Sequence, residues 1–323
     1  MSDLFLGIDL GGTKVLSAVI DADGNVLGRG KKKTGSGRDG EEIFSRLIES
    51  AEKAIEDAEI DRGQIKAIGV GSPGPLDPRT GIVIFTPNLG FRDFPLRDRV
   101  AEALGAPTFV NNDVSIGTFG EWQMGAGRGV RDLIGMFVGT GIGGGLILDG
   151  KLYDGFNRVA GEIGHMPMAE GGPKCGCGNR GCLEAFASRS AISNALIKAL
   201  EAGEPSALRG EFKGDPPAIR SKALARAYAA GDALTVKTLD QAAKTIGKAV
   251  GSLANILCPE MFVLGGGFIE ALGADYVAKI DRAAREWAFE INMRDVKIVP
   301  ASLGDDSAIQ GAASYARICV AER

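Results

Sequence analysis

The chain has 323 residues, which is enough for two domains with sizeable cores. Its formal net charge of −4 gives no reason to expect nucleic acid or an anionic membrane as a partner. The first six residues carry an early acid and no basic segment, so they do not read as a signal peptide. The longest uncharged stretch, 133–148, is too short and too rich in glycine for a membrane-spanning helix. With cysteines expected to be reduced, we predict a cytoplasmic protein.

Apolar runs alternate with helical patterns along the chain, which is typical of an α/β protein. The opening order is strand, glycine turn with a threonine, strand and Asp-Gly turn, and it recurs about 130 residues later, which indicates a duplicated architecture. The pattern predicts strands at 4–8, 15–20, 26–30, 65–70, 107–110, 133–138, 146–148 and 261–264, and helices at 41–58, 183–200, 234–257 and 306–321.

Three of the five cysteines, Cys175, Cys177 and Cys182, lie within eight positions, shortly after His165, the only histidine. Three thiolates and one imidazole suit a tetrahedral, structural zinc ion. The alternatives are a disulfide or unligated buried thiols. A Cys-X-Cys bridge is strained and the cysteine count is odd, so the pattern favours zinc.

Three glycine-rich turns, at 11–12, 139–145 and 265–267, each follow an apolar strand. None is a Walker A loop or a clear dinucleotide fingerprint, and any one alone is commonplace. Together, with Thr13 and Thr140 beside two of them, they favour phosphate binding, because glycine lets backbone N–H groups approach phosphate oxygens.

Two aspartates are candidates for chemistry on phosphate. Asp113 follows a predicted strand, where α/β sheets place ligands, and can accept the proton of an attacking hydroxyl. The alternative is that Asp113 caps the next helix. Asp9 is a candidate for Mg²⁺ or its waters, and Lys14 either supplies a point charge or is solvated.

A set of amides, carboxylates and one imidazole matches the paired hydrogen bonds that a polyol makes. Each member taken separately can also be a surface or capping residue. The set comprises Asn88, Asn112, Asp113, Glu162, His165 and Glu184.

Four segments, 9–14, 139–145, 161–165 and 175–184, together resemble the ROK family of sugar kinases, and 88–96 is similar to its glucokinase branch. The resemblance implies an α/β, actin-like (ribonuclease H-like) duplicated fold of two lobes with the active site in the cleft between them. It implies a small lobe of 1–111 plus 306–323 with the phosphate-binding hairpin, and a large lobe of 112–305 with the zinc site and the sugar- and adenosine-binding elements.

The resemblance also implies roles: ATP-dependent transfer to the 6-hydroxyl of a hexose, with Mg²⁺ accompanying ATP and Asp113 as general base. His165 would bind zinc through one ring nitrogen and face the sugar with the other. The implied sugar contacts are Asn88, Asn112, Asp113, Glu162, His165 and Glu184; the zinc ligands are His165, Cys175, Cys177 and Cys182; and the nucleotide contacts are Asp9, Gly11, Gly12, Thr13, Lys14, Thr140, Gly141, Gly265, Gly266 and Gly267.

Glucose is the predicted substrate, and a homodimer or homotetramer is implied by the family alone. The alternatives are a kinase for N-acetylglucosamine, N-acetylmannosamine, mannose or fructose, a polyphosphate donor, and a sugar-responsive repressor. Because the phosphate turn starts at Asp9, we expect no helix-turn-helix domain before it. The chain departs from the family at 114–116 and at Phe91, where tryptophan is frequent.

Overall fold

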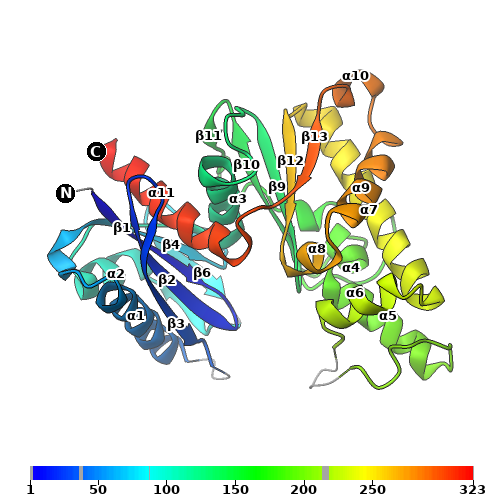
Figure 1. Cartoon of the computed structure of the whole chain (residues 1–323), viewed down its shortest axis with the longest axis horizontal. Coiled ribbons are helices and arrows are strands. Elements are labelled where there is room, and N and C mark those ends of the chain that lie inside the picture. The colour runs from blue at the N-terminus through cyan, green and yellow to red at the C-terminus, as the bar shows by residue number, and fades with distance from the viewer. Residues whose placement is uncertain (1–2, 36–38, 87, 213–217, 323) are drawn as a thin grey trace. The chain divides into compact units, whose positions relative to one another are not determined.

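The computed structural model describes residues 3–35, 39–86, 88–212 and 218–322. The chain divides into two compact units: residues 1–131, 145–161 and 305–323 form the first, and residues 132–144 and 162–304 form the second. Figure 1 labels most of their helices and strands. Within the described ranges, no helix combines the length and the apolar character needed to cross a bilayer.

The first unit is built on a five-stranded sheet in the order β3-β2-β1-β4-β8. β1 pairs antiparallel with β2, and β2 with β3, whereas β1, β4 and β8 run parallel. The carboxyl ends of β1, β4 and β8 therefore meet at one edge of the sheet. The strands are β1 (Leu4–Leu10), β2 (Lys14–Asp21), β3 (Val26–Lys33), β4 (Ile65–Ser72) and β8 (Thr108–Asn112).

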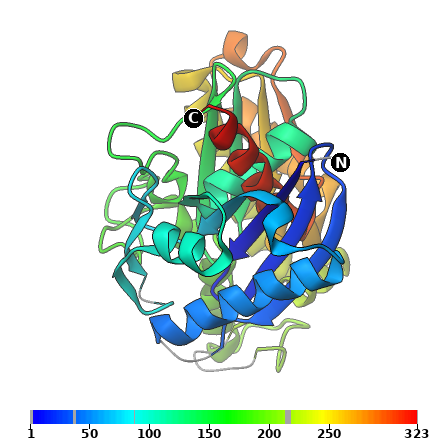
Figure 2. The ribbon, with the colours of Figure 1, turned by 90° about the vertical axis from the view of Figure 1, so that its left-hand side faces the viewer.

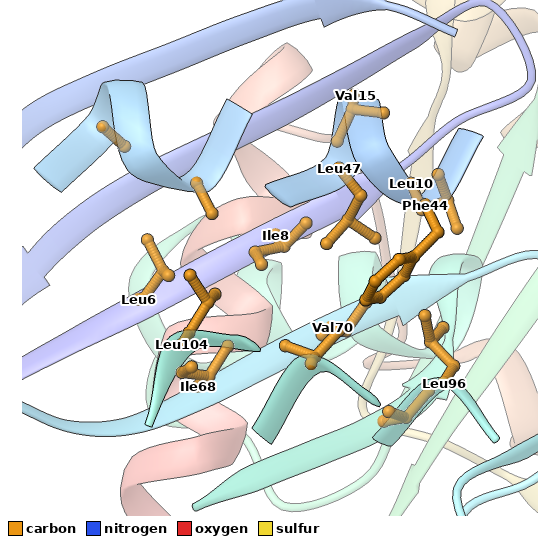
Figure 3. Packing of buried hydrophobic residues seen from close by; sticks show 14 of the residues in the cluster. Leu6, Ile8, Leu10, Val15, Phe44, Leu47, Ile68, Val70, Leu96 and Leu104 are labelled. Atoms are coloured by element: carbon orange, nitrogen blue, oxygen red, sulfur yellow. The ribbon is translucent and has the colours of Figure 1, made fainter. Parts of the chain in front are cut away.

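Helix α1 (Gly40–Asp57) covers one face of this sheet, and Figure 2 shows it lying across the strands. Alternate residues of β1, Leu6, Ile8 and Leu10, are fully buried in the same cluster as Phe44 and Leu47 of α1 (Figure 3). Burying each such side chain is worth about 1.5–3 kcal/mol. Apolar residues spaced by two along the strand and by three or four along the helix are thus buried in one core.

Helix α11 (Ser307–Ala321) packs on the opposite face, against residues of β1 and β4. Its approach depends on glycine. A Cβ atom at Gly7 would lie 2.0 Å from the carbonyl oxygen of Ile309, and one at Gly69 would lie 1.8 Å from that of Ala312. The first unit is therefore a helix–sheet–helix sandwich whose second helical layer comes from the end of the chain.

A three-stranded sheet, β5-β6-β7, and helix α2 follow β4 and were not predicted. Phe91 is fully buried and its ring stacks on that of Phe94 at 4.3 Å. The residue that replaces the family's frequent tryptophan is thus a core residue here. The elements are β5 (Leu76–Asp77), β6 (Ile82–Thr86), β7 (Phe91–Phe94) and α2 (Leu96–Leu104).

Helix α3 (Asp113–Met124) begins where β8 ends and belongs to the first unit. Its buried Glu121 accepts a hydrogen bond of 2.9 Å from Ser307 Oγ at the start of α11. The predicted boundary between residues 111 and 112 therefore differs from the observed division, which also assigns residues 145–161 to the first unit. The physical reason is that α3 packs on α11, a contact between distant parts of the chain.

A second five-stranded sheet has the order β11-β10-β9-β12-β13, which is the order of the first sheet when each set is numbered along the chain. β9, β12 and β13 run parallel, as β1, β4 and β8 do. The repeated topology agrees with the predicted duplication. The strands are β9 (Leu133–Val138), β10 (Ile142–Leu148), β11 (Lys151–Leu152), β12 (Met261–Gly265) and β13 (Lys297–Pro300).

Helices make up most of the rest of the second unit. The single helix predicted at 183–200 is divided at Ser188, whose side chain accepts from the Ala191 amide and caps a new helix. The helices are α4 (Leu183–Ala187), α5 (Arg189–Glu201), α6 (Ser221–Ala229), α7 (Ala233–Leu257), α8 (Gly267–Leu272), α9 (Ala274–Arg285) and α10 (Glu290–Met293).

Candidate functional site

In the first unit, the predicted polar residues gather at the carboxyl edge of the parallel strands. Asp9 near the end of β1 pairs with Gly71 of β4, and Ser72 of β4 pairs with Asn112 of β8. A Cβ atom at Gly71 would lie 3.4 Å from the Cα of Asp113. The edge where α/β sheets bind ligands thus carries both predicted aspartates.

Asn112, and not Asp113, caps α3. The Asn112 side chain accepts from the amides of Val114 and Ser115 at 3.0 and 3.1 Å. Asp113 is the first residue of the helix, and its Oδ1 accepts from the Val114 amide at 2.9 Å. The alternative role considered for Asp113, capping of the next helix, therefore belongs to its neighbour Asn112. The helix N-terminus still favours a negative charge at Asp113.

Asp9 has an unusual electrostatic environment. Burial, the charge of Asp113 and, to a lesser extent, that of Asp305 together raise the pKa of Asp9 to about 7, against the opposing charge of Lys14. The Lys14 Nζ donates to Asp305 Oδ2 at 2.5 Å. Asp305 is therefore a member of the same charged cluster.

Hydrogen bonds at Gly11 hold the base of the predicted phosphate turn between β1 and β2. The Gly11 amide donates to the Lys14 carbonyl at 3.0 Å, and Thr34 Oγ1 donates to the Gly11 carbonyl at 2.7 Å. Gly12 and Thr13 at the tip are exposed. The turn is thus held by its base and open at its tip.

In the second unit, the two other predicted glycine turns lie side by side, because β9 and β12 are neighbouring parallel strands with Phe137 opposite Gly265. Gly266 has a φ of +87°, and a Cβ atom there would lie 2.5 Å from the Val138 carbonyl oxygen. Glycine at this position is required both by the backbone conformation and by the closeness of the neighbouring strand.

Arg189 is a residue of this edge that the sequence reasoning missed. Its Nη2 donates to Thr140 Oγ1 at 2.8 Å, and its backbone amide donates to the Gly139 carbonyl at 2.9 Å. Because the arginine occupies a lone pair of the threonine oxygen, the threonine O–H is left to donate elsewhere. In the sequence Arg189 is 49 residues from Thr140 and lies in no motif, so no local pattern indicated this contact.

The predicted metal ligands converge. His165, Cys175, Cys177 and Cys182 place their ligand atoms within 4.8 Å of one another, and all three thiols are free. The structure therefore pairs none of the three in a disulfide.

The distances within the group also fit a tetrahedral ion. With ligand bonds of about 2.3 Å to sulfur and 2.0–2.1 Å to nitrogen, tetrahedral zinc would separate two sulfurs by about 3.8 Å, and sulfur from nitrogen by about 3.6 Å. The Cys177 and Cys182 sulfurs are 3.8 Å apart, and the Cys175 sulfur is 3.6 Å from His165 Nδ1. This donor set can hold a metal ion.

Two carboxylates adjoin this cluster. Glu162 Oε2 lies 3.8 Å from His165 Nε2, the ring nitrogen that does not face Cys175. Glu184 Oε2 accepts from the Ile142 amide at 2.9 Å, and a Cβ atom at Gly141 would lie 2.3 Å from that oxygen. Gly141 thus accommodates the Glu184 carboxylate, a reason for this glycine that the turn pattern did not reveal.

The predicted sugar contacts are divided between the units. Asn88, Asn112 and Asp113 belong to the first, and Glu162, His165 and Glu184 to the second. Asn88 is exposed, in the turn between β6 and β7, rather than at the strand edge that carries Asn112.

Comparisons with known proteins agree with this architecture. The model of the ROK family matches residues 5–318. The glucokinase of Streptomyces coelicolor is 32% identical over 97% of this chain and 98% of its own length. The crystal structure of a ROK family glucokinase from Streptomyces griseus, in complex with glucose and AMPPNP, has a TM-score of 0.84 at 33% identity and covers 98% of this chain and 99% of its own. The xylose repressor of Caldicellulosiruptor bescii is 30% identical over 95% of this chain and 76% of its own length.

The chain therefore belongs to the ROK family. The predicted fold class, a duplicated α/β fold of the actin-like type, is confirmed by the two sheets of equal order and by the likeness to ROK sugar kinase structures.

Proposed function

We propose that this protein is an ATP-dependent sugar kinase that phosphorylates the 6-hydroxyl of glucose. The observation that carries the proposal is the charged cluster at the carboxyl edge of the first sheet. There Asp113, Asp9 and Lys14 interact beside an open glycine turn. The similarity to glucokinases along nearly the whole chain supports the choice of sugar.

In the proposed reaction, the 6-hydroxyl oxygen attacks the γ-phosphorus of ATP, the bond from phosphorus to the ADP oxygen breaks, and Asp113 takes the hydroxyl proton. Phosphoryl transfer needs positioning and electrostatic stabilisation more than covalent participation by the protein. The position of Asp113 at the start of α3 suits this role, because the backbone that carries it is fixed by the Asn112 cap.

Asp9 is the proposed residue for Mg²⁺ or its waters. When bound beside Asp9, this ion would supply positive charge that neutralises the phosphates of ATP. The carboxylate of Asp9 suits a cation because burial and neighbouring carboxylates penalise its bare charge. Lys14 and the exposed tip at Gly12 and Thr13 would contact phosphates, with Gly11 forming the base of the turn.

Thr140 and Gly141 would contact the nucleotide from the second unit, and the turn at Gly265, Gly266 and Gly267 would lie on the adenosine side. The pairing of β9 with β12 supports this grouping, since it places both turns at one edge.

The proposed metal at the Cys3His cluster is a structural zinc ion. A zinc ion bound there would tie together loop residues that have little regular structure of their own. It would fix His165, and with it the adjacent carboxylates of Glu162 and Glu184, which remain predicted sugar contacts along with Asn88 and Asn112. His165 would bind through Nδ1, leaving Nε2 beside Glu162.

A hexose panel tests the function directly. ADP production would be measured with glucose, mannose, fructose, N-acetylglucosamine and N-acetylmannosamine, with ATP and polyphosphate as separate donors. We expect the highest kcat/KM with glucose and ATP. Faster turnover of an amino sugar would replace glucose as the substrate, and failure to phosphorylate any sugar, together with specific DNA binding at physiological salt, would favour a repressor.

A further inference from the structure

A buried amide lies immediately before the two residues at the proposed catalytic edge. Asn111 is 1% exposed and is the penultimate residue of β8, directly before Asn112. A buried primary amide must satisfy two donors and an oxygen acceptor, since unpaired polar atoms in the interior cost about 1–3 kcal/mol. Its partners therefore determine how it is oriented.

The orientation of the Asn111 amide follows from chemistry. Its Oδ1 lies 2.7 Å from the backbone nitrogen of Asn112. A backbone N–H can only donate, so the oxygen and not the NH₂ group must face it. The NH₂ group consequently faces the opposite side, toward Asp154 Oδ1 at 3.1 Å and Tyr315 Oη at 3.4 Å.

Asp154 enforces this orientation. It lies in the loop after β11, where its carbonyl accepts from the Ala160 amide at 2.9 Å. An ionised carboxylate only accepts hydrogen bonds, so it stabilises the NH₂ group opposite it and disfavours the flipped amide. Burial raises the pKa of Asp154, while the bond from Asn111 and the charge of Arg158 act in the opposite direction and favour the ionised form.

The effect reaches α3 through a continuous series of bonds. Asp154 orients Asn111, Asn111 accepts from the Asn112 amide, and the Asn112 side chain caps the helix that begins with Asp113. If the Asn111 amide flipped, its NH₂ group would oppose the Asn112 N–H, and two buried donors would face each other. Relief of that conflict would move the Asn111–Asn112 peptide, which carries this N–H, and with it the Asn112 cap that precedes Asp113.

We propose that Asp154 is a positioning residue for Asp113, acting by holding the Asn111 amide in one orientation, with Tyr315 as a secondary acceptor. This inference rests on the proposed role of Asp113 as the base. Displacement of a reacting group by about 1 Å can lower turnover by about 10²-fold. The expected signature is therefore a loss of kcat with little change in the KM for ATP.

The test begins with three single variants. Asp154→Leu removes the acceptor and is expected to lower kcat about 10–100-fold. Asp154→Asn keeps an oxygen acceptor and is expected to stay within about 5-fold of wild type. Asn111→Asp places two carboxylates against each other and is expected to lose kcat as Asp154→Leu does.

The double variant Asn111→Asp/Asp154→Asn exchanges the two groups. The carboxylate at position 111 would still accept from the Asn112 amide, and the amide at 154 would donate to it. We expect kcat to recover at least about 5-fold from that of Asn111→Asp. A residue with a merely structural role would show no such rescue, so the double variant keeps the proposal falsifiable if Asp154→Leu does not fold.

Asp232→Ala serves as the control for destabilisation alone. Asp232 caps α7 and accepts from the Thr235 and Ala207 amides, remote in sequence from this network. Its loss is expected to lower Tm without changing kcat. A folded Asp154→Leu with wild-type kcat, or a double variant no better than Asn111→Asp, would overturn the inference. Failure of the proposed function is separate: it would appear as full activity in Asp113→Asn or as no sugar phosphorylation by the wild type.

Discussion

Burial, together with the negative charge of nearby Asp113, raises the pKa of Asp9 to about 7. Catalytic sites often contain pairs of titratable groups whose environments shift their pKa values apart. In this protein Asp9 lies near the end of β1 and Asp113 directly follows β8, although the two strands are far apart in sequence. The relationship between Asp9 and Asp113 therefore has consequences both for stability and for activity.

The first prediction concerns stability. Because the folded-state pKa of Asp9 lies above its ordinary value of 3.8, the folded state keeps a proton that the unfolded state has lost between about pH 4 and pH 7. The ionised Asp9 thus destabilises the fold increasingly as pH rises through this window. We expect Asp9→Asn to raise Tm by at least about 2 °C at pH 8 and to change it little at pH 4.

Thermal unfolding without Mg²⁺ and nucleotide would measure this effect. Asp98, exposed in the first turn of α2, offers the matched control Asp98→Asn, which should show no such pH-dependent gain. A Tm difference for Asp9→Asn that is the same at both pH values would contradict the raised pKa.

The second prediction concerns the proposed base. Asp113→Asn should lower kcat by about 10²–10⁴-fold, since general-base catalysis contributes about that much. Asp98→Asn is again the comparison, because it also removes an aspartate from the first turn of a helix in the same unit. Steady-state kinetics with glucose would measure both. Retention of more than about a tenth of wild-type kcat in Asp113→Asn would exclude the assigned role.

The third prediction concerns the metal. We expect one zinc ion per chain by elemental analysis, lost in Cys177→Ser and kept in Cys258→Ser, because Cys258 lies outside the cluster. Removal of the ion should weaken glucose binding at least about 10-fold while nucleotide binding is retained. Changes to the groups that surround a metal site commonly cost about 10–100-fold in affinity or activity.

Calorimetric titration with each ligand, before and after chelation, separates the two effects. If chelated protein bound glucose with unchanged affinity, the metal would be a remote structural element with no influence on Glu162 and Glu184.

The fourth prediction concerns Arg189. Replacing it with methionine removes the charged donor to Thr140, and hydrogen bonds to charged groups contribute about 1.5–3 kcal/mol. We expect the KM for ATP to rise about 10-fold with a smaller change in the KM for glucose, and Arg189→Lys to recover part of the loss. Arg226→Gln, at an exposed arginine paired with Glu211, is the control. Equal effects on both KM values would indicate that Arg189 only stabilises the fold.

Local patterns in the sequence were sufficient for much of the architecture. The runs at 4–8, 133–138 and 261–264 each lie inside an observed strand, because a buried strand needs only a short apolar segment between turns. The repeated order of strands and glycine turns indicated the duplication. The spacing of three cysteines and one histidine identified a group that the structure brings within reach of a single ion.

Other features depend on contacts that no local pattern encodes. The sequence could not assign α3 to the first unit, because that depends on its packing against α11, nearly 200 residues later. It did not connect Arg189 with Thr140, Asp305 with Lys14, or Asp154 with Asn111. Each of these pairs joins side chains from different elements, and their hydrogen bonds form only when the sheets bring those elements together.

The sequence by itself thus determined the kinds of groups present: a Cys3His set, three glycine turns and an aspartate after a strand. Only the tertiary structure decided that Asn112 takes the helix cap at Asp113, that Asp9 lies half-buried beside other carboxylates, and that Asn111 has a fixed amide orientation. The physical reason is that residue chemistry is local, whereas burial, charge coupling and hydrogen-bond partnership depend on the distances that folding establishes.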